Sequence, residues 1–190
     1  MLIKIHERIG INERDIHHEK CEAMLQNLFP IQLNLDQYVI KKRGLHDIDL
    51  FQGKMVALKT ELFEAVNEWR GFKHWSDNQK PKEGLLEELS DTFHFILSVG
   101  LEKGIHRKKR YYRTPDKELK VSGEHSAMSI IEMTDRLINE YWSEKTYKAW
   151  YAMFHQFMEL VFSFGFQIEH LYDAYMDKNK VNFDRQNNGY

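Results

Sequence analysis

The residues best suited to chemistry are four carboxylates that form two pairs with the same spacing. Glu61 and Glu64 are three residues apart, and so are Glu88 and Asp91 in the next helical stretch. On an α-helix, a separation of three places two side chains on one face. The second pair lies in a stretch that is apolar on nearly every face, so we expect it to be at least half buried. Buried carboxylates require compensation.

Four converging carboxylates would repel one another unless a cation lay between them. Oxygen ligands alone select hard ions, which here means Mg²⁺ or Mn²⁺. Two or three such ions could polarise a phosphoanhydride and generate hydroxide from bound water. The alternative is that both pairs lie on solvated helix faces, because a single pair at this spacing is common. Spacing alone does not decide between the two interpretations.

The chain that must position these groups has 190 residues, a formal net charge of −2, and only 10 glycines and 3 prolines. So few helix breakers favour long helices over a β-sandwich or barrel. The charge argues against a general polyanion binder, and the single Cys21 excludes an internal disulfide. No apolar run is long enough to span a bilayer, and the N-terminus lacks the apolar core of a signal peptide, so we expect a cytoplasmic protein.

Hydrophobic periodicity predicts an all-α fold, a multi-helix bundle of antiparallel helical hairpins in one domain over residues 1–190. The expected helices cover about 19–28, 30–44, 47–69, 85–101, 126–142 and 145–164, with a last one from about 167. Residues 70–84 are polar and are expected to form a loop. Residues 103–124 carry a basic run with glycine and proline, which predicts a long loop or insertion.

Three segments resemble motifs of the dimeric, all-α dUTP pyrophosphatase (dUTPase) family, a branch of the MazG-like all-α nucleoside triphosphate pyrophosphatases. They read LKTELFEAVNEWRGFKHWSD, LLEELSDTFHFILSVGLEKG and YMDKNKVNFDRQNNGY. The paired carboxylates are shared by the whole superfamily. The NEWRGFKHW segment, the DxxHF run and the KxxxNxxRQxxGY tail are more specific to the dUTPase branch. The resemblance spans roughly residues 32–190.

The resemblance implies a homodimer that uses Mg²⁺ to hydrolyse dUTP to dUMP and pyrophosphate, with dUDP as a further candidate substrate. This reaction would limit uracil in DNA. The resemblance also implies two or three Mg²⁺ ions, with Mn²⁺ as a substitute, held by Glu61, Glu64, Glu88 and Asp91; Glu61 is our first choice as the base. It assigns nucleoside binding to Gln32, Asp36, Trp75 and Phe95. It assigns phosphate binding to Lys178, Asn182 and Arg185, whose spacing places them on one helix face.

Two other functions stay open at this level. One is a related all-α pyrophosphatase for another nucleoside triphosphate, which would differ in the base pocket rather than in the carboxylates. The other is a non-catalytic helical protein that regulates or binds nucleic acid through residues 103–124. For that segment a solvated loop is favoured, because the chain is slightly acidic. The last residues, 186–190, are polar and are expected to fray without a ligand.

Overall fold

The computed structural model describes residues 13–107 and 126–188, and these residues form helices and connecting loops with no strand. The elements are α2 (Glu13–Arg43), α3 (Phe51–Trp69), α4 (Leu85–Glu102), the 3₁₀ turn η1 (Ile105–Arg107), α5 (Ala127–Glu144), α6 (Tyr147–Ser163) and α7 (Ile168–Asn188). The expected all-α fold is confirmed. Most of the expected insertion at 103–124 lies outside the described residues. Within the described ranges, no helix combines the length and apolarity needed to cross a membrane.

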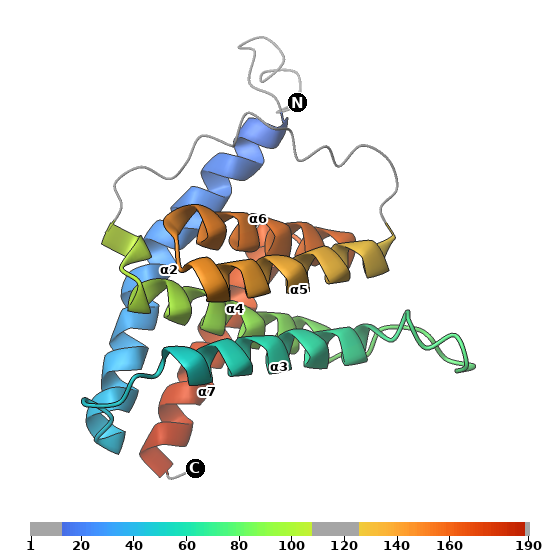
Figure 1. Ribbon diagram of the computed structural model, residues 1–190. Helices are drawn as coiled ribbons and strands as arrows, with labels where there is room; N and C mark the ends of the chain where they lie inside the picture. The colour runs from blue at the N-terminus through green and yellow to red at the C-terminus, as the bar shows by residue number, and fades with distance from the viewer. Residues whose placement is uncertain (1–12, 108–125, 189–190) are drawn as a thin grey trace, which may run out of the picture.

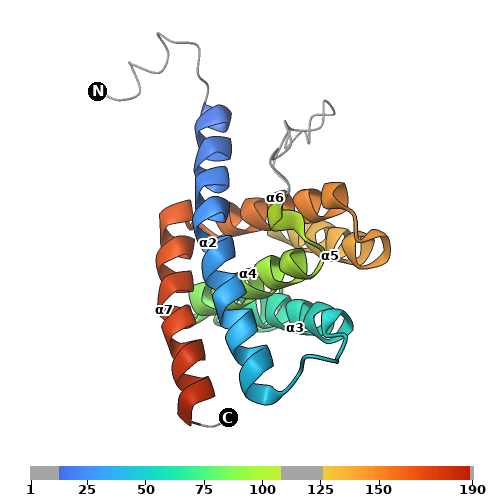
Figure 2. The ribbon, with the colours of Figure 1, turned by 90° about the vertical axis from the view of Figure 1, so that its left-hand side faces the viewer.

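The helices form two antiparallel hairpins, α3–α4 and α5–α6, which stack in layers, while α2 and α7 run side by side across their edge (Figures 1 and 2). Unlike the hairpins, α2 and α7 are parallel. Lys20 pairs with Glu169 near the start of both helices (Nζ to Oε1, 2.6 Å), and Tyr38 bonds Asn187 near their ends. Helices so far apart in the sequence need no short connection, so they are free to pack in parallel.

Helix α2 is continuous through Pro30, so the predicted break between residues 28 and 30 is wrong. Proline inside a helix removes one backbone hydrogen bond and costs about 3 kcal/mol or more. Leu25 and Leu28 before it are fully buried, and Leu35 after it is 5% exposed. Burying a leucine contributes about 1.5–3 kcal/mol. The apolar contacts on both sides of Pro30 therefore outweigh the missing bond and keep one continuous helix.

The α3–α4 hairpin agrees with the predicted one except at its start. Helix α3 begins at Phe51 rather than residue 47, and the Phe51 amide donates to Asp49 Oδ1 at 3.0 Å. The predicted loop at 70–84 is confirmed. Arg70 adopts a left-handed conformation (φ 63°) that ends α3, and its guanidinium donates to the carbonyl of Asn78. The loop is thus tied to the end of α3.

Helix α4 lies at the centre of the core and is fixed by α6. Phe93 stacks on Phe157 with ring centroids 5.9 Å apart, and the Trp150 indole donates to the carbonyl of Ile96 at 2.9 Å. Gly100 leaves room for that indole, because a Cβ at this position would lie 2.7 Å from Trp150 Nε1. These contacts set the rotation of α4 and so decide which of its side chains face α2, α3 and α7.

Candidate active site

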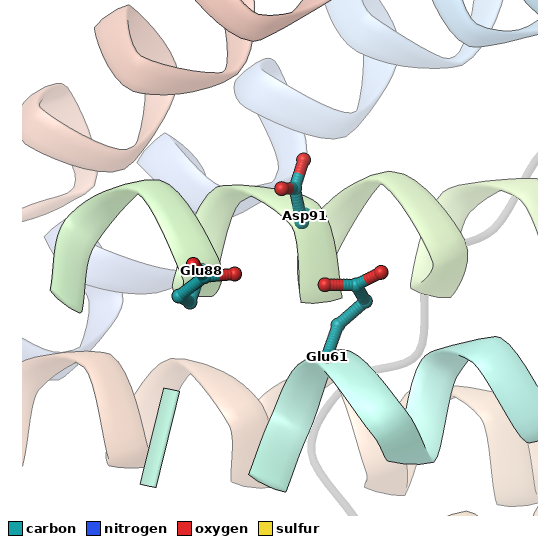
Figure 3. A group of neighbouring side chains, drawn as sticks. All are labelled: Glu61, Glu88 and Asp91. Carbon is teal, nitrogen blue, oxygen red and sulfur yellow. The ribbon is translucent and has the colours of Figure 1, made fainter. Parts of the chain in front are cut away.

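Three carboxylates converge between α3 and α4. Glu61, Glu88 and Asp91 each place one oxygen so that all three atoms lie within 4.8 Å of one another. Figure 3 shows Glu61 reaching from α3 toward α4, where the other two lie one turn apart. All three residues are partly buried. The antiparallel packing of the hairpin therefore brings Glu61 of the first predicted pair to both residues of the second pair.

Glu64, the fourth predicted ligand, is exposed on α3 and is not a member of this group. Its charge still acts on the group, since it contributes to raising the pKa of both Glu61 and Glu88. The role of Glu64 as a metal ligand stays a prediction.

The charged forms of the three carboxylates are disfavoured by burial and by mutual repulsion. Burial first, and then the neighbouring carboxylates Asp91, Glu64 and Glu88, raise the pKa of Glu61 to about 7. Burial also raises the pKa of Glu88 and of Asp91. One pKa unit corresponds to about 1.36 kcal/mol. A bound cation would relieve this penalty, and a set of oxygen donors alone fits a hard divalent ion.

Lys178 of α7 approaches the cluster from the opposite side. Its ammonium lies 2.5 Å from Asp91 Oδ2 and 2.7 Å from Glu87 Oε1, and its side chain is 8% exposed. The hydrogen bond from Lys178 lowers the pKa of Glu87, a residue that sequence reasoning missed. Lys178 is predicted to bind phosphate; in this structure it is an internal cation for the acidic cluster.

A pocket of about 270 Å³ opens beside the carboxylates. Its polar and aromatic lining joins four helices: Gln32 and Asp36 from α2, Lys54 and Glu61 from α3, Asp91, His94, Phe95 and Ser98 from α4, and Asn182, Arg185 and Gln186 from α7. Candidate residues for nucleoside, metal and phosphate binding thus share one cavity. Phe95 is only partly buried, in contrast to Phe93, which is fully buried in the core. Part of the Phe95 ring is therefore accessible to a ligand.

Trp75 is the predicted nucleoside residue that the structure does not bring to this pocket. It lies in the 70–84 loop with 77% of its surface exposed, and its ring packs edge-on against Phe72. Its role in binding stays a prediction.

The end of α7 packs against α2. The helix continues to Asn188, and Arg43 Nε donates to Gln186 Oε1 at 2.9 Å. The Tyr38 and Phe183 rings also pack together, with centroids 5.2 Å apart. Residues 186–188 are thus helical and have partners on α2 that the sequence of the tail alone does not reveal, and their fraying without a ligand stays a prediction.

A polar network in the pocket wall was missed by sequence reasoning. Lys54 Nζ lies 3.1 Å from Asp36 Oδ2 and 2.5 Å from Glu102 Oε1, and the Ser98 hydroxyl donates to Asp36 Oδ2 at 2.6 Å. A signal existed, since Lys54 precedes Glu61 by seven residues and Ser98 follows Asp91 by seven. A separation of seven returns a side chain to the same helix face.

Comparison with known proteins bears on the site as a whole. A family model described as dUTPase matches residues 24–190, a range that includes the acidic cluster and every residue of the pocket. A search of curated proteins finds no match to this chain.

Proposed function

This chain belongs to the dUTPase family and is a dUTP diphosphatase, and we propose that it hydrolyses dUTP to dUMP and pyrophosphate by using Mg²⁺ bound beside the pocket. The observation that carries the proposal is the convergence of Glu61, Glu88 and Asp91 at the edge of a cavity lined by nucleoside and phosphate candidates. Such a reaction would remove dUTP and supply dUMP.

The acidic cluster fits the metal that this reaction needs. Glu61, Glu88 and Asp91 would hold the ion, and we include Glu64 as a further ligand because its charge already acts on the group. When bound, Mg²⁺ neutralises the carboxylates, polarises the phosphoanhydride and lowers the pKa of a water molecule. We propose two or three ions, with Mn²⁺ able to replace them.

The remaining pocket residues would bind and orient the substrate. Phe95 offers a ring face to the base, and Gln32 offers an amide. Asn182 and Arg185 line the same cavity from α7, where the guanidinium can bind two phosphate oxygens at once. Lys178 would contribute a further positive charge. We also propose Glu61 as the general base, because its carboxylate belongs to the acidic cluster and lines the pocket.

We also propose that the protein is a cytoplasmic homodimer. Val56 and Phe63 on α3 are 55% and 47% exposed, and their separation of seven places them on one face of the helix. An apolar face of this kind suits contact with a second copy of the chain. Sedimentation would test this, since substitution of both residues by serine should shift a dimer toward monomer.

Pyrophosphate release from a panel of deoxynucleoside triphosphates, with and without Mg²⁺, tests the proposed reaction. We expect Mg²⁺-dependent release from dUTP and at least about tenfold slower release from dTTP, since a close-packed pocket lacks room for the additional methyl group of thymine. Equal rates on dTTP and dUTP would contradict the assigned specificity. Hydrolysis that persists in excess chelator would contradict the metal site.

A further inference from the structure

The side-chain amide of Gln32 is held from both ends by buried hydrogen bonds. The Tyr175 hydroxyl donates to Gln32 Oε1 at 2.7 Å, and His94 Nδ1 lies 2.8 Å from the same oxygen. Gln32 Nε2 in turn donates to Asp36 Oδ1 at 2.7 Å. Gln32, Tyr175 and His94 are all at most 5% exposed. In such surroundings each unmatched polar atom is costly, so these hydrogen bonds favour one orientation of the Gln32 amide. Within the described residues, His94 Nε2 has no hydrogen-bond partner.

Asp36 determines which way the amide points. A carboxylate only accepts hydrogen bonds, so the amide nitrogen must face Asp36 and the amide oxygen must face Tyr175. The reverse orientation would set the amide oxygen against the carboxylate oxygen. Asp36 is itself held by Ser98 at 2.6 Å and by Lys54 at 3.1 Å, so its oxygens are engaged within the protein.

This orientation of the amide determines the hydrogen positions at its opposite end. Burial lowers the pKa of His94 to about 3, so its ring is neutral and carries one hydrogen. We assign that hydrogen to Nδ1, since the atom it faces is an oxygen. Tyr175 and His94 then fill both lone pairs of Gln32 Oε1. Among the described residues, Asp36 is the partner of Nε2, which leaves Gln32 one N–H and no acceptor for a ligand.

We propose that Asp36 and Tyr175 are positioning residues that make Gln32 a donor-only group, and that this N–H reads the carbonyl at C4 of the base. Uracil has an oxygen at this position, whereas cytosine has an amino group, which would place two donors together. The inference rests on the proposed function and deepens it. It gives Asp36 a different role from the nucleoside contact expected from the sequence.

The test is the ratio of kcat/KM for dUTP to kcat/KM for dCTP, measured with Mg²⁺ on the full chain. In Tyr175→Phe the ring remains and only the hydroxyl is lost. In Asp36→Asn the new amide can present either oxygen or nitrogen to Gln32. We expect each variant to raise KM for dUTP about tenfold with little change in kcat, and to lower the ratio about 10- to 100-fold.

Tyr38→Phe is the matched control, because it removes a hydroxyl that bonds Asn187 outside this network and should leave the ratio unchanged. Melting temperatures would show that the variants are folded. An unchanged ratio in folded Tyr175→Phe, or a loss confined to kcat, would overturn the positioning role. Failure of the unmodified protein to prefer dUTP over dCTP would instead contradict the proposed function itself.

Discussion

Replacing Glu61 by glutamine should raise the stability of the metal-free protein while abolishing most of its activity. The pKa of Glu61 rises from 4.5 to about 7, chiefly because the group is buried among other carboxylates. At about 1.36 kcal/mol per pKa unit, the charged Glu61 carboxylate destabilises the folded protein by at most roughly 3 kcal/mol. Because the side chain is only partly buried, solvent screening reduces this to about 1–2 kcal/mol.

The sign of the pH dependence follows from proton linkage. Between pH 4.5 and 7 the folded protein keeps a proton on Glu61 that the unfolded chain has lost. The free energy of unfolding therefore decreases as the pH rises through this range, and the penalty is complete above pH 7. Glutamine at position 61 carries no charge, so the variant does not have this penalty. Glu61→Gln should thus be more stable than the parent at about pH 8 and nearly equal to it at about pH 4.5.

Urea denaturation with a chelator at both pH values measures this difference. Added Mg²⁺ should then reverse the order of stability, since a ligand at 100 times its Kd adds about 2.7 kcal/mol only to a protein that binds it. Glu132→Gln, at an exposed position on α5, is the matched control and should change neither quantity. A metal-free Glu61→Gln that is less stable at pH 8, or an equal gain from Mg²⁺ in both proteins, would refute the cation site.

Three further outcomes are expected. Lys178→Met should lower the metal-free free energy of unfolding by about 2–3 kcal/mol in urea titrations, because it leaves Asp91 without its buried partner; a loss below about 0.5 kcal/mol would argue against the ion pair. The Mg²⁺ concentration for half-maximal hydrolysis should be higher at pH 6 than at pH 8, because protons compete for Glu61, and equal values would contradict this. Gly100→Ala should cost about 1–3 kcal/mol, seen as a lower melting temperature, because its Cβ would meet the Trp150 indole 2.7 Å away; an unchanged melting temperature would show that the indole moves at no cost.

Much of the fold could be read from local pattern. Helical periodicity located α4 to within a residue and the 70–84 loop at its observed place, because both depend on which side chains are apolar and where glycine and proline fall. The spacing of Glu61, Glu88 and Asp91 likewise placed them on the facing sides of one hairpin. The family motifs then pointed to dUTP, a conclusion that spacing alone could not reach.

Other features were decided only by contacts between distant segments. Pro30 lies inside a continuous helix because buried leucines on either side outweigh a local backbone penalty. Lys178 faces Asp91, and Tyr175 faces Gln32, because α7 packs against α2 and α4. A sequence specifies which groups each helix presents. Which of those groups become partners depends on how the helices pack, since burial makes an unpaired charge or amide too costly to leave alone.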